Sequence, residues 1–135
     1  MKELVLKALV ENIPQVIAFV DEQLEALDCP MKIQLQIDMA IDEIFCNIAS
    51  YAYGETPGEA SVLFDYDEEK RQVSITFADS GIPFNPLEME EPDVTLSAAE
   101  RKIGGLGIFL VKKTMDDMIY QREDEKNLLT IRKTI

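Results

Sequence analysis

The stretch from Ile103 to Val111 reads Ile-Gly-Gly-Leu-Gly-Ile-Phe-Leu-Val and places three of the chain's six glycines within four positions. An apolar run follows the glycines at once, which predicts a helix. A glycine-rich turn at a helix start aims free N–H groups and the positive end of the helix dipole at one point, and this suits a phosphate. The same residues also suit a tight turn that merely caps a helix. The stretch alone leaves both interpretations open.

The composition limits the classes of protein that the chain can belong to. It has 135 residues, 47% of them hydrophobic, and a formal charge of −13, which suits one domain over residues 1–135 with a buried core. The acidity disfavours nucleic acid and anionic membrane as partners, because both reward Lys and Arg patches. No apolar run approaches the roughly 20 residues of a membrane span, and the charged N-terminus leaves no signal-peptide core. We therefore expect a cytoplasmic protein.

The chain has two cysteines and no histidine. Cys29 and Cys46 are expected to be small buried hydrophobes in a reducing compartment. Without histidine a zinc site has little support. A general base, if the protein has one, would have to be a carboxylate, a lysine or a tyrosine.

The apolar periodicity predicts the element order β-α-α-β-β-α-β-β. The expected elements are a strand near residues 4–10, helices after Asn12 and over 31–51, strands 61–66 and 72–79, a helix from the glycines to about 117, and strands 118–122 and 128–135 joined by a loop over 123–127. This order implies an α+β two-layer sandwich, with three main helices on one face of a mixed, mostly antiparallel sheet. The acidic segment 87–103 lacks periodicity, so we expect a long loop of the lid type there.

The second predicted helix carries a polar stripe beside its buried face. Isoleucines recur along it at steps of three and four, at Ile33, Ile37, Ile41, Ile44 and Ile48. Glu43, Asn47 and Tyr51 are spaced by four and share one edge of that face, where they suit either a ligand site or an ordinary helix surface. Asp38 and Asp42 lie further round and are expected to be solvated.

A carboxylate ends the third predicted strand. Asp79 has the same parity as Val73, Ile75 and Phe77, so it should point toward the interior. A buried carboxylate is costly without hydrogen-bond donors. Asp79 therefore either serves a site or caps the turn that follows it.

Three of these pieces together resemble the nucleotide-binding boxes of the GHKL ATPase superfamily. The pieces are Glu43-x-x-x-Asn47, Asp79-x-Gly81-x-Pro83-Phe84-x-Pro86 and Gly104-Gly105-Leu106-Gly107. That superfamily includes histidine kinases, type II topoisomerase subunits, a heat-shock chaperone family and mismatch-repair ATPases. The resemblance covers nearly the whole chain and is greatest to the small anti-sigma-factor serine kinases, which are ATP-binding partners of STAS-domain anti-anti-sigma proteins.

The resemblance implies a role for each box. Asn47 would coordinate the Mg²⁺ that bridges the ATP phosphates, and Glu43 would be the general base. Asp79 would accept the adenine amino group, and Gly81 would let the adenine lie against the backbone. The remaining residues expected at the cofactor are Tyr51, Pro83, Phe84, Arg101, Lys102, Gly104, Gly105, Leu106, Gly107 and Ile108.

Some of these expectations carry alternatives. Arg101 or Lys102 would bring a cation to the γ-phosphate, although such a pair is equally at home in solvent. Relatives often carry histidine where Tyr51 stands. The hydroxyl residue that they often have early in the last strand would fall near Asn127 or Leu128, so its role is not transferred to Thr130.

The function that the resemblance implies is a Mg-ATP-dependent serine/threonine kinase. It would phosphorylate a STAS-domain anti-anti-sigma partner, control a sigma factor and work as a homodimer. An ATP-sensing switch with little chemistry is a second hypothesis. An interaction domain with a degenerate pocket is a third.

Overall fold

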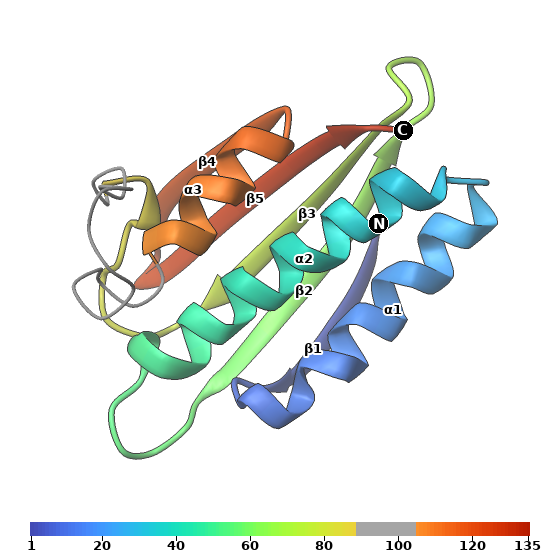
Figure 1. The fold of residues 1–135 in the computed structure, drawn as a ribbon. Helices are drawn as coiled ribbons and strands as arrows, with labels where there is room; N and C mark the ends of the chain where they lie inside the picture. Colours follow the sequence, from blue (N-terminus) through green and yellow to red (C-terminus); the bar gives the residue numbers. More distant parts are fainter. Residues whose placement is uncertain (89–104) are drawn as a thin grey trace.

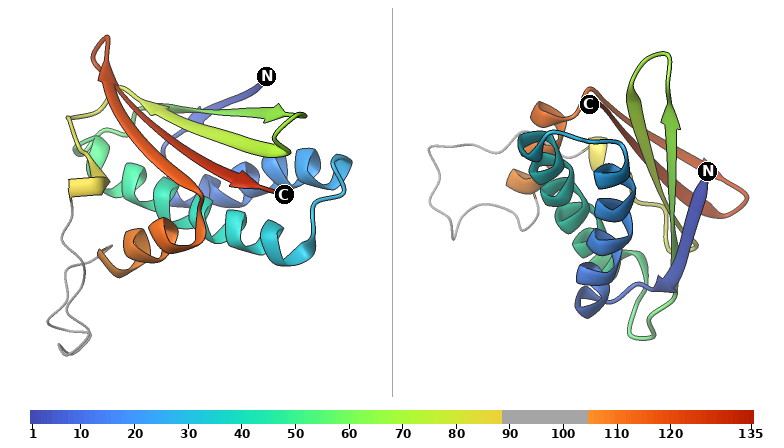
Figure 2. Two further views of the ribbon diagram at one scale, coloured as in Figure 1. Left: turned by 90° about the horizontal axis from the view of Figure 1, so that it is seen from above. Right: turned by 90° about the vertical axis from the view of Figure 1, so that its right-hand side faces the viewer.

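The computed structural model describes residues 1–88 and 105–135, and of residues 105 and 106 it describes the backbone only. In these residues a five-stranded sheet and three α-helices form two layers (Figures 1 and 2). Seen from above, the sheet lies on one side and all three helices lie on the other (Figure 2, left). The α+β two-layer sandwich expected from the sequence is confirmed.

The sheet is antiparallel between every pair of neighbouring strands. Its strands are β1 (Lys2–Lys7), β2 (Glu59–Asp67), β3 (Gln72–Asp79), β4 (Asp117–Glu123) and β5 (Lys126–Thr134), in the spatial order β1-β2-β3-β5-β4. Consecutive strands can pair antiparallel through short turns, and β2-β3 and β4-β5 do so, whereas β1 and β2 pair across the chain segment that forms α1 and α2. The pairing of β3 with β5 brings the end of β3 beside the start of β5.

The three helices are α1 (Ile13–Ala26), α2 (Met31–Asn47) and α3 (Gly105–Thr114). The central one is α2, which packs against both α1 and α3 (Figure 1). It continues into a π-helical turn over Ile48–Ala52. Its inner face is fully buried at Ile37, Ile41 and Ile44, as the isoleucine spacing predicts.

The core lies between the layers. The inward side chains of the two central strands, Val73, Ile75 and Phe77 on β3 and Leu129 and Ile131 on β5, are buried against the helices. Asp79 continues this inward row and is itself buried. The helix layer and the alternation of β3 together position the site that is described below.

Several boundaries and the burial of three residues differ from the expectations. Cys29 and Cys46 are half-buried rather than buried. Strand β1 ends at Lys7, and Val10 is exposed in a 3-10 turn over Val10–Asn12. Helix α3 ends at Thr114, and Asp116 accepts a hydrogen bond from the N–H of Thr134 at the end of β5. The prediction that Asp38 is solvated is wrong: Asp42 is exposed, but Asp38 is half-buried with one carboxylate oxygen enclosed.

The β4–β5 turn is shorter than the loop expected over 123–127. It consists of Asp124 and Glu125, which have φ values of 51° and 64°. Two consecutive left-handed residues are what a tight two-residue hairpin requires. Asn127 therefore belongs to β5, where it pairs with Asp79 of β3.

No helix within residues 1–88 and 105–135 has the length and apolarity needed to cross a bilayer.

Candidate functional site

Three separate segments meet at one end of the molecule. They are the C-terminal end of α2 with its π-helical turn, the turn that follows β3, and the N-terminal end of α3 (Figure 1). Between them lies a pocket that is partly open to solvent. Its lining is mostly apolar and consists of Ile44, Asn47, Ile48, Ala52, Asp79, Phe84, Pro86, Ile108, Tyr120, Asn127 and Leu129.

Asp79 supplies a carboxylate to this pocket. Its Oδ1 atom accepts hydrogen bonds from the backbone N–H of Gly81 at 2.9 Å and from Asn127 Nδ2 at 2.9 Å. Among the described residues no donor reaches Oδ2. One oxygen is thus fixed by the protein, and the other is available to a hydrogen-bond donor on a ligand.

Asn127 holds several segments around Asp79. Its Nδ2 group donates both to Asp79 and to the carbonyl of Ile82, the latter at 2.8 Å. Its Oδ1 accepts from the hydroxyl of Tyr120 and from the N–H of Phe84. A buried Asn that uses both N–H donors and accepts two hydrogen bonds at its oxygen is a rigid element. Sequence analysis missed this role, because it placed Asn127 in or beside a loop.

The turn after β3 packs closely on the end of α2. Gly81 lies so near Ala52 that a Cβ atom at position 81 would overlap the Ala52 carbonyl group. The N–H of Ile82 donates to that carbonyl oxygen at 2.8 Å, and Arg122 donates to the Gly81 carbonyl at 2.8 Å. Glycine is thus required at position 81 because Ala52 comes so close. The sequence did not predict this contact.

Glu43 and Asn47 are one helical turn apart on α2, as predicted. Asn47 is buried and lines the pocket, and its Nδ2 group donates to Glu43 Oε1 at 3.4 Å. Burial raises the pKa of the Glu43 carboxyl group, the hydrogen bond from Asn47 lowers it, and the charge of Asp42 raises it again, with a net increase. A carboxylate with a raised pKa is a stronger base than an ordinary one.

Helix α3 places its first turn directly against Glu43. A Cβ atom at position 107 would overlap the Glu43 carboxyl carbon and both of its oxygens. A larger residue at position 107 would displace the end of the Glu43 side chain from this position. The glycine-rich start of α3 and the polar edge of α2 therefore belong to the same site.

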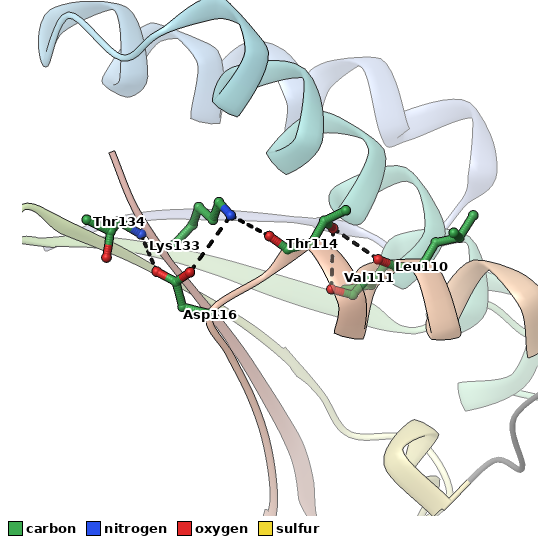
Figure 3. A network of polar contacts seen from close by, with 6 residues as sticks. All are labelled: Leu110, Val111, Thr114, Asp116, Lys133 and Thr134. Carbon is green, nitrogen blue, oxygen red and sulfur yellow. Dashed lines mark hydrogen bonds and ion pairs between the residues drawn. The ribbon is translucent and has the colours of Figure 1, made fainter.

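The opposite end of α3 is anchored to the sheet (Figure 3). Lys133 Nζ donates to the Thr114 carbonyl at 2.6 Å and pairs with Asp116 at 3.8 Å, while the N–H of Thr134 donates to Asp116 at 2.6 Å. Partial burial raises the pKa of Asp116, but the Thr134 hydrogen bond and the Lys133 charge outweigh it and lower that pKa. These contacts fix the helix that carries Gly107.

The other predicted residues fall into three groups. Phe84 and Ile108 line the pocket. Tyr51 lies beside it, with its ring centroid 5.8 Å from that of Phe84, whereas Pro83 is exposed and the buried proline at the pocket is Pro86. Of the glycine box, Gly105 and Leu106 begin α3, and Arg101, Lys102 and Gly104 lie outside the described residues, as does most of segment 87–103.

The side chains that line the pocket suit an adenine nucleotide. Apolar walls from Ile48, Ala52 and Leu129 suit a flat aromatic ring, and the available Asp79 oxygen suits a ring amino group. Asn47 brings an amide oxygen to the pocket wall, and amide oxygens suit Mg²⁺.

Comparison with known families settles the class of protein. The sequence pattern of the histidine kinase-like ATPase domain matches residues 6–133. The chain belongs to this family. The resemblance to the GHKL superfamily, predicted from the three boxes, is confirmed.

The curated relatives of this ATPase-domain chain are named as protein kinases. It is 31% identical over 101 residues to the serine/threonine-protein kinase BtrW of Bordetella bronchiseptica, covering 74% of this chain and 70% of that protein. It is 32% identical over 100 residues to the serine-protein kinase RsbW of Listeria monocytogenes, covering 70% of this chain and 62% of that one. The chain thus spans about three fifths of the length of the RsbW proteins that it matches, 58% for that of Bacillus mycoides.

A solved structure has the same fold. A chain of the SiaB-SiaC complex from Pseudomonas aeruginosa aligns with a TM-score of 0.60 over 98% of this chain and 89% of that one, at 16% sequence identity. At this identity the likeness concerns the fold alone.

Proposed function

We propose that the protein is a Mg-ATP-dependent serine/threonine kinase that phosphorylates a STAS-domain partner in a partner-switching circuit. The observation that carries the proposal is the contact between Glu43 and Gly107. It brings a carboxylate of raised pKa to the helix start where phosphates would bind. The names of the BtrW and RsbW relatives support the same activity.

Glu43 would take the proton from the hydroxyl group that attacks the γ-phosphate. Phosphoryl transfer depends mainly on positioning and charge stabilisation. The hydrogen bond from Asn47 and the contact with Gly107 hold the Glu43 carboxylate in one place. It is also half-buried, so less solvent competes for it.

The pocket would hold the nucleotide in a defined orientation. Asp79 Oδ2 would accept the adenine amino group at one end, and the free N–H groups of the first turn of α3 would bind phosphates at the other. Asn47 lines the same pocket and would supply an oxygen ligand to Mg²⁺. Arg101 and Lys102 remain predicted γ-phosphate contacts. A sigma factor as second partner and a homodimer are further predictions from the family resemblance.

Phosphotransfer to a purified STAS-domain protein tests the proposal. The STAS protein would come from the genome that encodes this chain, and the ATP would carry a radioactive γ-phosphate. We expect label on a serine or threonine of the STAS protein with the wild-type chain and Mg²⁺. The label should be absent with EDTA and with Glu43→Gln.

Nucleotide binding separates the alternatives. Binding of Mg-ATP without label transfer would favour the ATP-sensing switch. A thermal unfolding midpoint that does not move with Mg-ATP would favour the degenerate pocket, because a ligand that binds the native state raises that midpoint.

A further inference from the structure

An apolar stripe runs along the outer face of α2, away from the pocket. Met31, Leu35 and Met39 are spaced by four and therefore lie in one row. Their side chains are 63%, 54% and 66% exposed within the described structure. Large apolar side chains that gather on a surface typically mark an interaction site, and methionine suits an adaptable one.

The surface around this stripe is strongly acidic. Helices α1 and α2 and the turn between them carry a single basic residue, Lys32. Their acidic residues are Asp21, Glu22, Glu25, Asp28, Asp38, Asp42 and Glu43. A second copy of the chain docked through this face would bring two acidic surfaces together, and nucleic acid or an anionic membrane would be repelled. A partner with basic side chains is the complementary one.

Two carboxyl groups beside the stripe face each other and share a hydrogen bond. Asp38 follows Leu35 by three residues on α2 and faces Asp21 of α1 across the seam between the helices. The Oδ1 atoms of both residues are buried, and no donor from another residue in the described structure reaches either of them. Apart from the proton that the pair can share, no donor among the described residues offsets the charge of these oxygens.

We propose that the Met31–Leu35–Met39 stripe is a docking surface for an amphipathic helix of a partner protein. The apolar side of that helix would pack against the stripe, helix against helix. A Lys or Arg of the partner would lie over the Asp21–Asp38 pair and favour its ionised form over the form that shares a proton. None of these residues lines the nucleotide pocket, so the inference goes beyond the kinase proposal and does not depend on it.

Docking of a cation should be linked to proton release. Burial raises the pKa of Asp38 to about 8, and the hydrogen bond with Asp21 and the charges of Asp21 and Glu25 contribute. Cys29 also faces the pair, and its pKa is raised, mainly by burial and further by the charges of Asp38 and Asp21. Asp42 lies one turn further along α2. At neutral pH the pair therefore retains a proton. A partner cation favours the ionised form, so affinity should rise as the pH increases to about 8 and level off above it.

Calorimetric titration of the full chain with a synthetic helix tests this proposal. The probe is a peptide of about 18 residues with leucines along one side and arginines beside them, long enough to form a helix on binding. Titrations at physiological salt, in two buffers of different ionisation enthalpy, measure affinity and proton release together. We expect saturable binding with net proton release at pH 7, and loss of that release with Asp38→Asn.

Two double variants locate the binding surface without changing any charge. Leu35→Ser with Met39→Ser should weaken binding about tenfold, because two apolar contacts are lost. Val5→Ser with Ile119→Ser removes exposed apolar side chains elsewhere and should leave affinity unchanged. Circular dichroism checks that both variants are folded.

The proposal would be overturned by unchanged affinity in the α2 variant, by equal weakening in both variants, or by binding without proton release. It would also be overturned if the wild type sediments as a dimer that the α2 variant converts to a monomer, because the stripe would then join two copies of the chain.

Discussion

Gly107 of α3 lies directly against the carboxyl group of Glu43 on α2. The two residues come from separate sequence boxes, and each has an ordinary structural explanation when it is taken alone. Because the two residues are in contact, the glycine cluster and the polar edge of α2 belong to one site, and the glycines do more than cap a helix. The predictions about catalysis begin from this contact.

Gly107→Ala should displace the Glu43 carboxylate and lower phosphotransfer. The added methyl group would occupy the space of that carboxylate, which is the end of a flexible side chain and would move aside. Stability should change little, because alanine favours a helix interior over glycine by about 1 kcal/mol. Phosphotransfer and urea unfolding measure the two effects. Gly54→Ala is the matched control, because nothing lies within 4 Å of a Cβ atom there, and it should retain full activity. Equal phosphotransfer by the two variants would contradict the contact.

Glu43→Gln should abolish activity without weakening the fold. We expect phosphotransfer to fall at least about 100-fold, the usual contribution of a general base. The pKa of Glu43 is raised in the folded state, so its ionised form destabilises that state. This cost is absent below the unfolded-state pKa and grows as pH rises through the folded one.

The glutamine keeps the acceptor for Asn47 but has no charge to bury, so the variant should be at least as stable as the wild type at neutral pH. Urea unfolding checks this. Asp42→Asn changes the exposed neighbour and should retain phosphotransfer. Full activity of Glu43→Gln would show that another group is the base.

Asn127→Ala should weaken both the fold and nucleotide binding. It removes donors from Asp79 and Ile82 and an acceptor from Phe84, and unsatisfied buried groups cost about 1–3 kcal/mol each. Chemical unfolding and ATP titration report the two effects. Gln121→Ala, exposed on β4, should change neither. A wild-type affinity for ATP in Asn127→Ala would mean that Asp79 keeps its orientation without this support.

Acid should loosen the anchor of α3. The pKa of Asp116 is lowered in the folded state, so its contribution to stability is present above its unfolded-state pKa. It is lost as pH falls through the folded one. In Asp116→Asn, unfolding free energies measured from neutral pH to about pH 3 should fall less steeply than in the wild type. Parallel curves for the two proteins would argue against this role of Asp116.

The order of elements and the inward position of Asp79 could be predicted because both follow from local periodicity. The family could be predicted because each of its three boxes is a short, continuous stretch of sequence. The two-residue turn at Asp124 and Glu125 could not, since neither residue is the glycine or asparagine that usually marks left-handed backbone. The role of Asn127 was missed for that reason.

The reason for glycine at position 81 and the enclosure of Asp38 were also missed. Both depend on a partner from another element, Ala52 for Gly81 and Asp21 for Asp38. Spacing along one segment carries no information about such a neighbour.

The central claim is that Asp79, Asn47 and the start of α3 form one ATP pocket. Calorimetric titration of Mg-ATP and Mg-GTP into the wild type and Asp79→Asn tests it most directly. We predict that the wild type binds Mg-ATP in preference to Mg-GTP, and that Asp79→Asn binds Mg-ATP at least about tenfold more weakly because the acceptor for the adenine amino group is lost. Equal affinity of the two proteins for Mg-ATP would contradict the account.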